Sequence, residues 1–420
     1  MLAGFASQIL LARYLGPQGK GVVDLFLLIP TVLASVLEFG LLSANTYYAG
    51  KGTIPIDTLH SNSVVWSMGL GVLVVILGMA AYELNLDIFH SLPGRVLFFS
   101  LASLLPSLYF SLWSGLMYGS DSARAVYFVS AIATVAALVL YAIGMIFKAG
   151  VETLVVLTCL SLYGRAAVCF QLVRRRSSVL ARPSFVALRQ ALSYGVALYI
   201  GIAIATLHLR IGQILIERHL GAAQLGLFAL SSRIAELVWL LDYVVQSAIL
   251  YRITSASRSD AVLLSQRASQ LVLILVMVPS VVIFVTAPYV VPLVFGEPFR
   301  PSVQPLSLML PGIIFFSLGR SLTPFIAYQC GKPWYNTLAA AVAFVVNVLC
   351  NTLLIPRFGI NGAGVALSLS SFTNFLLVAL TFRYLSGGSL LKTFVPSPHD
   401  LKLVIAYARE QFSEYFQKNK

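Results

Sequence analysis

Long apolar segments recur along almost the whole chain and constrain its fold more than any other feature. Hydrophobic residues make up 59% of the sequence and charged residues only 10%, whereas a soluble domain carries roughly 25% charged residues. Such a chain belongs in a lipid bilayer. The apolar residues do not alternate with a period of two, so we predict an all-α membrane protein. The twelve predicted transmembrane helices are 2–15, 22–44, 62–83, 96–118, 125–147, 152–173, 192–216, 224–250, 266–287, 302–328, 334–355 and 361–384.

A short motif occurs twice in the chain. The sequence Gln8-Ile-Leu-Leu-Ala-Arg-Tyr-Leu-Gly16 matches Gln213-Ile-Leu-Ile-Glu-Arg-His-Leu-Gly221 at an offset of 205 residues (213 minus 8), which also pairs Gly21 with Gly226. Each copy is the end of an apolar helix that stops at a glycine. The repetition predicts two copies of one helical unit.

Six predicted helices fall in each copy, so both copies have the same orientation. The repeat axis is then a pseudo-two-fold along the membrane normal. The predicted domains are an N-terminal six-helix lobe at 1–173, a basic cytoplasmic linker at 174–191, a C-terminal six-helix lobe at 192–384 and a cytoplasmic tail at 385–420. The first segment is short for a membrane helix, and we expect the natural start to lie upstream.

The placement of Lys and Arg predicts the orientation. Seventeen of these residues lie in segments that follow even-numbered helices, and seven, including Lys20, lie on the opposite side. The positive-inside rule then places both termini in the cytoplasm. The net charge of +13 has the same explanation, so no nucleic-acid partner is expected.

Two basic or amphipathic regions have more than one interpretation. The linker cluster from Arg174 to Arg189 is expected to be a topology anchor and interdomain linker, with a regulatory or lipid-headgroup site as the alternative. The segment from His399 to Lys420 fits an amphipathic helix on the inner membrane surface or, equally, a frayed tail.

The sequence contains no recognisable catalytic or nucleotide-binding motif. The patterns GxxxxGK[ST], HExxH, GxSxG and CxxC are all missing from the 420 residues, so ATP-driven transport and an enzyme are both disfavoured. The four cysteines fall in or at the end of apolar segments and are interpreted as core residues. No cofactor or metal is expected.

Several charged residues lie within apolar segments. Each costs at least about 2.5–3.5 kcal/mol at the centre of a membrane helix, so a lipid-facing position is disfavoured. Arg233 and Glu236 are spaced to pair with each other, and Arg210 shares one helix face with Glu217. Local pairing is therefore one interpretation, and contact with a substrate is the other. The residues are Arg165, Arg210, Arg233, Arg320, Asp24, Glu38, Glu236 and Asp242.

The alternative interpretation is a cationic, water-filled cavity between the two halves. Guanidinium groups bind phosphate oxygens through two parallel hydrogen bonds and stay charged, so Arg165, Arg210, Arg233 and Arg320 favour a polyanion such as a diphosphate. Glu38 and Asp242 occupy nearly corresponding places in the repeat (242 minus 38 is 204). Together with Asp24 and Glu236, they are candidates for ion coupling or charge pairing.

The chain resembles a family of bacterial transporters. The motifs that carry the resemblance are Gln8 to Pro17, Gly21, Leu37-Glu-Phe-Gly-Leu41, Leu293-Val-Phe-Gly-Glu297, Gly331-Lys-Pro333 and Ile355 to Ala363. They are similar to those of bacterial polysaccharide exporters, and most closely to the Wzx-type O-antigen flippases of the multidrug/oligosaccharidyl-lipid/polysaccharide superfamily. These motifs mark helix ends and turns, so they identify the superfamily better than a substrate.

The resemblance implies two six-helix lobes around a central cavity with alternating access. It implies an undecaprenyl-diphosphate-linked oligosaccharide that moves from the inner to the outer leaflet of the bacterial inner membrane. In such flippases, cavity arginines attract the diphosphate, and Arg210, Arg233 and Arg320 are the candidates here, followed by Arg165. A monomer suffices for this function, and a polysaccharide polymerase is a candidate partner.

Other functional classes remain open. An exporter of drugs or small molecules from the same superfamily, coupled to sodium or protons, is the main alternative. An organic cation would need carboxylates without competing arginines, whereas this chain has both carboxylates and arginines in its apolar segments. The arginines therefore favour an anionic substrate. A membrane-embedded polymerase or ligase would need a large extracytoplasmic loop, which the sequence does not predict. A proton gradient, a sodium gradient or the membrane potential are all candidates for driving the transport cycle.

Overall fold

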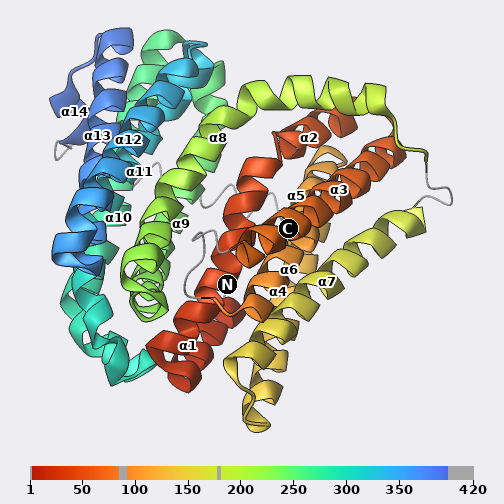
Figure 1. Cartoon of the computed structure of the whole chain (residues 1–420). Coiled ribbons are helices and arrows are strands. Elements are labelled where there is room, and N and C mark those ends of the chain that lie inside the picture. The colour runs from red at the N-terminus through yellow and green to blue at the C-terminus, as the bar shows by residue number, and fades with distance from the viewer. Residues whose placement is uncertain (1, 85–91, 177–180, 396–420) are drawn as a thin grey trace, which may run out of the picture. The chain divides into compact units, whose positions relative to one another are not determined.

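A computed structural model describes residues 2–84, 92–176 and 181–395, and its regular elements there are helices (Figure 1). Eleven segments of this part of the chain are long and apolar enough to cross a membrane. The prediction of an all-helical protein with many membrane-spanning segments is therefore confirmed. The predicted amphipathic helix from His399 to Lys420 lies outside the described residues.

The helices follow the predicted apolar segments, although many extend further. They are α1 (Leu2–Leu37), α2 (Leu41–Lys51), α3 (Ile56–Glu83), α4 (Gly94–Ala102), α5 (Leu104–Gly119), α6 (Ala123–Ile146), α7 (Val151–Arg176), α8 (Phe185–Leu220), α9 (Ala222–Ser255), α10 (Arg258–Phe295), η1 (Glu297–Ser302), α11 (Val303–Pro324), η2 (Phe325–Gln329), α12 (Trp334–Phe358), α13 (Ile360–Ser386) and α14 (Leu390–Phe394).

The predicted count of twelve transmembrane helices is not confirmed: eleven described segments are long and apolar enough to cross a membrane, and one of them contains the first predicted helix and the start of the second. Both begin within α1, and one candidate span covers Ala3–Leu37. Gly16 has φ 63° and ψ −176° inside α1, so two helical stretches meet there at a kink. A second break at Glu38–Gly40 separates α1 from α2, within what the sequence predicts as one helix.

The two copies of the repeated motif share an unusual backbone conformation. Gly16 has φ 63° and ψ −176°, and Gly221, its equivalent, has φ 80° and ψ 179°. These angles belong to a region open almost only to glycine. The repetition in sequence is therefore also a repetition of local structure.

Gly21 and Gly226, the second pair of glycines that the repeat relates, are in direct contact. A Cβ atom on Gly226 would lie 2.3 Å from the carbonyl oxygen of Pro17 and 2.9 Å from the backbone nitrogen of Gly21. A Cβ atom on Gly21 would lie 1.7 Å from the carbonyl oxygen of Ala222. Only glycine lets the backbones of α1 and α9 approach this closely.

The described structure falls into two compact units. The described residues within 1–210, 217–227 and 294–299 form unit 1, and the described residues within 211–216, 228–293 and 300–420 form unit 2. The predicted domain boundaries at 173, 191 and 384 stay predictions.

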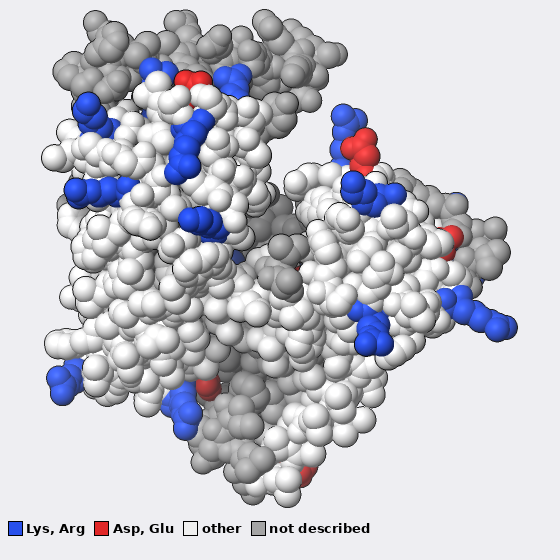
Figure 2. Space-filling view, turned by 90° about the horizontal axis from the view of Figure 1, so that it is seen from above, with Lys and Arg blue, Asp and Glu red and all other residues white. Residues whose placement is uncertain are grey.

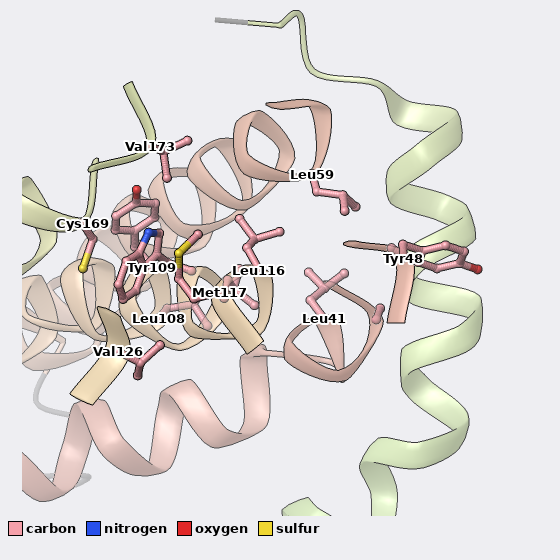
Figure 3. Packing of buried hydrophobic residues seen from close by; sticks show 14 of the residues in the cluster. Leu41, Tyr48, Leu59, Leu108, Tyr109, Leu116, Met117, Val126, Cys169 and Val173 are labelled. Atoms are coloured by element: carbon pink, nitrogen blue, oxygen red, sulfur yellow. The ribbon is translucent and has the colours of Figure 1, made fainter. Parts of the chain in front are cut away.

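The core of unit 1 is built on α5. Leu108, Leu112, Trp113 and Leu116 of α5 are fully buried among apolar residues of α2, α3, α6 and α7. Figure 3 shows part of this cluster, including Leu41 and Tyr48 on α2. Asn45 of α2 donates hydrogen bonds at 3.0 Å to Ser63 Oγ and to the carbonyl oxygen of Leu112, so this buried amide joins α2 to α3 and α5.

The segment before α8 is held by the first turns of α3. The Asn62 amide donates to the carbonyl oxygen of Ser184 at 3.1 Å and accepts from the Ser184 backbone N–H at 2.8 Å. The Ser61 hydroxyl donates to the carbonyl oxygen of Ala181 at 2.7 Å. Ser184 also caps α8 by accepting from the N–H of Ala187 at 3.3 Å. These bonds define where α8 begins.

In unit 2, α11 packs against α13 through small residues. A Cβ atom on Gly312 would lie 2.7 Å from the Cα atom of Ser368. The Ser368 hydroxyl accepts from the N–H of Gly312 at 3.0 Å and donates to the carbonyl oxygen of Leu308 at 2.6 Å. This contact holds the middle of α11, the helix that carries Arg320.

Much of the outer surface is apolar. On α3, Val72, Ile76 and Leu77 are between 52% and 60% exposed. Figure 2 shows that Lys, Arg, Asp and Glu cover only a small part of the visible face. A surface of this kind is stable against lipid tails and not in water.

The glycine contact predicts a loss of stability in Gly226→Ala. The added methyl group meets the carbonyl oxygen of Pro17, so α1 and α9 must move apart, and overpacking of this kind costs about 1–3 kcal/mol. Thermal unfolding of the detergent-purified variant, followed by tryptophan fluorescence, should give a Tm roughly 1–3 °C lower, because each kcal/mol shifts the Tm of a chain of 420 residues by about 1 °C.

The control is Gly164→Ala in α7. No atom lies within 4 Å of a Cβ at Gly164, and alanine favours a helix over glycine, so its Tm should stay the same or rise. Equal Tm values for the two variants would show that the contact at Gly226 is not tight in solution.

Candidate functional site

Two predicted site residues come together in unit 2, one from each of two helices. Asp242 lies on α9 and its side chain is fully buried, whereas Arg320 lies on α11 and its side chain is 34% exposed. The Nη1 atom of Arg320 is 3.9 Å from Oδ2 of Asp242. The guanidinium carbon also lies 5.6 Å from the centre of the Tyr243 ring. Arg320 therefore has a buried counter-ion and an exposed side.

Asp242 is held by a neighbour on its own helix. Gln246, one turn later, donates through Nε2 to Oδ1 of Asp242 at 2.7 Å. Oδ2 is buried and has no hydrogen-bond partner in the described part of the chain. The charge of Arg320 is therefore the main compensation for this oxygen, because a buried carboxylate without a nearby cation is very costly.

The backbone at Arg320 is irregular just beyond the residue. Pro324 has no N–H group to donate to the carbonyl oxygen of Arg320, and the Thr323 hydroxyl donates to that oxygen instead, at 2.9 Å. The chain then continues as the π-helix η2, in which Cys330 N–H donates to Phe325 O at 3.0 Å. Insertions of this type concentrate at functional sites.

The predicted pairing of Arg233 with Glu236 is confirmed. Nη1 of Arg233 lies 3.2 Å from Oε2 of Glu236 on α9. The side chains are 47% and 23% exposed, so the pair is more accessible than the pair of Asp242 and Arg320. An exposed pair at this spacing contributes about 0.3–0.5 kcal/mol.

The remaining predicted residues belong to unit 1. Arg210 and Glu217 lie on α8, half-buried and buried respectively. Arg165 on α7 lies with its guanidinium carbon 4.0 Å from the centre of the Phe110 ring, a cation–π contact. Glu38, in the turn after α1, accepts a hydrogen bond from the Ser111 hydroxyl at 2.7 Å. Their roles in substrate binding or ion coupling stay predictions.

Glu38 and Asp242 differ in local structure despite their related positions in the repeat. Glu38 lies in the break between α1 and α2, whereas Asp242 lies inside the continuous helix α9. A side chain in a turn and a side chain inside a helix face different neighbours, so the two carboxylates are not equivalent sites.

Asp24 has a partner, Lys20, whose predicted position is wrong. Lys20 is predicted in a loop, but it lies within α1, fully buried, and forms an ion pair with Asp24 one turn later. The spacing of four residues between Lys20 and Asp24 places both side chains on one face of a helix and indicates an ion pair. The apolar segment was predicted to begin only at residue 22, so that signal was missed.

A separate cavity in unit 1 contains none of the predicted site residues. It has a volume of about 340 Å³ and is lined by Arg95, Glu152 and Thr153 together with apolar residues of α4 and α7. Among the described residues, no group of His, Cys, Asp and Glu is arranged to hold a metal ion.

The buried ion pair in α1 predicts an asymmetry between single and double substitutions. Lys20→Met leaves Asp24 without its cation, and breaking a buried pair from one side costs about 3–5 kcal/mol. The double variant Lys20→Met/Asp24→Leu removes both charges and should recover most of this loss. Thermal unfolding of purified protein measures both, and a double variant as unstable as Lys20→Met would contradict the assigned pairing.

Comparisons with known proteins agree with this fold. The chain resembles the inward-facing conformation of a multidrug resistance MATE family transporter of the MOP superfamily, with a TM-score of 0.73 and 16% identity over 92% of this chain and 94% of that chain. It also resembles the lipid II flippase MurJ in an inward closed conformation, with a TM-score of 0.68 and 14% identity over 99% and 90% of the two chains.

A MOP superfamily transporter from Pyrococcus furiosus Vc1, described as having a binding pocket of reverse polarity, gives a TM-score of 0.60 at 14% identity over 92% of each chain. At these identities the likeness shows the fold alone. No curated protein sequence matches the chain.

The family is shown by a sequence model. The model described as "polysaccharide biosynthesis protein" matches residues 10–304, which is more than half of the chain. The chain thus has the fold of the MOP superfamily transporters and flippases and belongs to the polysaccharide biosynthesis protein family.

Proposed function

We propose that this protein is a flippase that moves an undecaprenyl-diphosphate-linked oligosaccharide from the inner to the outer leaflet of the bacterial inner membrane. The family match to polysaccharide biosynthesis supports a glycan substrate. The observation that carries the proposal is the partly exposed guanidinium of Arg320 inside an otherwise uncharged helix. A charged residue inside a membrane segment is costly, so the presence of this cation favours a role in binding an anionic, lipid-linked substrate.

Arginine suits a diphosphate better than lysine does. Its planar guanidinium donates two parallel hydrogen bonds to phosphate oxygens and stays charged in a membrane. In our proposal Arg320 is the principal ligand of the diphosphate. Arg165, Arg210 and Arg233 are further candidates, and of these Arg233 is already paired with Glu236.

The transport cycle in this proposal is alternating access without covalent chemistry. The lipid tail stays in the bilayer while the diphosphate and the sugars pass through a polar path. Asp242, Glu38, Asp24 and Glu236 are candidates for coupling to protons, sodium or the membrane potential. Both termini are cytoplasmic in this scheme, one chain suffices, and a polysaccharide polymerase acts on the product.

The alternative function is export of a small molecule driven by an ion gradient. The multidrug transporter has the highest TM-score of the three structures described above, and the fold fits both functions equally. An organic cation would have to bind near Asp242, where Arg320 lies 3.9 Å away. The arrangement of charge in unit 2 therefore favours an anionic substrate.

Substitution of Arg320 tests the proposed function. Arg320→Gln removes the charge and should reduce surface polysaccharide by at least about tenfold, since a lost charge-assisted contact costs more than about 1.4 kcal/mol. Arg320→Lys keeps the charge without the two-pronged geometry and should restore export in part. Surface polysaccharide is measured in a strain that lacks the wild-type protein.

The amount of protein in the membrane is measured in parallel, because Arg320→Gln also removes the counter-ion of Asp242. The double variant Arg320→Gln/Asp242→Asn removes both charges and serves as the control for folding. Normal export by Arg320→Gln at normal expression would contradict the proposed function of Arg320.

The alternative predicts a different phenotype. An exporter of organic cations should lower the accumulation of ethidium in cells, whereas a flippase should leave it unchanged. We expect equal ethidium accumulation with and without the protein, measured by fluorescence in cells with and without a proton or sodium gradient. Gradient-dependent ethidium efflux together with normal surface polysaccharide in the deletion strain would favour the exporter.

A further inference from the structure

The two helices that line the cavity in unit 1, α4 and α7, lie side by side and run in the same direction (Figure 1). The Tyr163 hydroxyl of α7 donates to the carbonyl oxygen of Ala102 on α4 at 2.9 Å, and the Cys159 thiol donates to that of Phe99 at 3.8 Å. Residue numbers therefore increase together along both helices. The cavity lies at their first turns, so these turns face the same side of the membrane.

The mouth of the cavity carries two opposite charges. Arg95 is the second residue of α4 and Glu152 is the second residue of α7, and both are exposed. Candidate membrane spans begin at the same places, at Gly94–Gly119 and Val151–Arg175, so both charges lie where lipid head groups are expected. Among the described residues, no ion pair joins Arg95 and Glu152 to each other. Both charges are therefore available to a ligand.

The floor of the cavity and the surface around it are apolar. Val96 and Val155 form part of the lining and are fully buried, whereas Val156, also in the lining, is 38% exposed. The neighbouring side chains of Phe98 and Leu160 are 43% and 60% exposed. A surface of this kind faces lipid tails. An acyl chain can thus reach the cavity from the bilayer without crossing water.

We propose that this cavity binds phosphatidylethanolamine, a phospholipid that carries a phosphate and a primary ammonium group. The phosphate lies at Arg95, the ammonium at Glu152 and the beginning of an acyl chain on the apolar floor. Guanidinium–phosphate and ammonium–carboxylate contacts are both charge-assisted hydrogen bonds. The volume of about 340 Å³ lies at the low end of the range of about 300–1,000 Å³ for ligand pockets, so the cavity takes the head group and not the whole lipid.

The pair of charges selects this lipid over others. Phosphatidylglycerol offers a phosphate to Arg95 but has no ammonium, and its net negative charge is repelled by Glu152. Phosphatidylcholine has the same two charges, but its quaternary nitrogen has no N–H group to donate to Glu152. A lipid-linked diphosphate carries more negative charge and no ammonium, so Glu152 disfavours it too. The site is therefore distinct from the transport path and does not rest on the proposed function.

The test titrates the detergent-purified full chain with three phospholipids of identical acyl chains and measures their binding by native mass spectrometry. Phosphatidylethanolamine should bind at least about threefold more tightly than phosphatidylglycerol or phosphatidylcholine, as expected for one exposed pair of opposite charges. Equal dissociation constants for all three lipids would show non-selective lipid contact and would overturn the proposal.

Glu152→Gln changes the two charged lipids in opposite directions. The variant loses the attraction for the ammonium and the repulsion of the anionic lipid, so phosphatidylethanolamine should bind more weakly and phosphatidylglycerol more tightly. The ratio of their dissociation constants should change by about threefold or more. Glu152 also lies in the first turn of α7, where an acidic residue stabilises a helix. A lower Tm with the wild-type ratio would leave Glu152 only that structural role and would overturn the proposal.

Arg95→Gln should weaken the binding of both phosphatidylethanolamine and phosphatidylglycerol, because both place a phosphate at this guanidinium. The side chain is exposed, so the variant is expected to fold. The matched control is Arg124→Gln. Arg124 is also exposed and is the second residue of α6, but it does not line the cavity. Equal losses of binding in the two variants would show a general attraction to basic residues and would contradict a site at Arg95.

Soluble phosphoethanolamine separates a lipid site from a site for the head group alone. It carries the same two charges without an acyl chain, so it should not displace phosphatidylethanolamine at equal concentration. Efficient displacement would show that the apolar floor contributes nothing and would overturn the assignment to a lipid.

Discussion

The absence of water around membrane-embedded side chains is the constraint on which the rest of this structure depends. A charge in hydrocarbon must find its partner within the protein. Lys20 is fully buried and pairs with Asp24 within one helix. Asp242 is fully buried and relies on Gln246 and Arg320. Glu38 accepts a hydrogen bond from Ser111. Intramembrane charges in this fold are therefore coupled groups, and a change at one alters the behaviour of its partner.

The second constraint on this structure is the close approach of helix backbones at small residues. Helices in a bilayer gain little from the hydrophobic effect and associate where small residues allow their backbones to approach. The contact of Gly21 with Gly226 and the contact of Gly312 with Ser368 are both of this kind. Gly40 and Gly195 form another, since a Cβ on Gly195 would lie 2.6 Å from the carbonyl oxygen of Gly40. Such contacts hold helices in place so that polar groups on them meet.

Ion pairs within one helix can be predicted from the spacing of the residues, and ion pairs between helices cannot. Arg233 and Glu236 lie three residues apart on one helix, so their pairing follows from helix geometry. Asp242 and Arg320 lie on different helices, and no spacing rule brings them together. The sequence predicts Lys20 between two helices, at 2–15 and 22–44, whereas it lies within α1. A charge that is neutralised four residues later does not end a membrane helix.

The sequence by itself determined that this is a helical membrane protein with a repeated motif, because apolar composition and the offset of 205 residues are independent of how helices pack. It also identified the charged residues that lipid would not tolerate. Only the tertiary structure decided which of them face each other, that Gly21 touches Gly226, and that Arg320 is partly exposed while its counter-ion Asp242 is buried. Those outcomes depend on contacts between helices that are distant in sequence, where no periodicity or spacing applies.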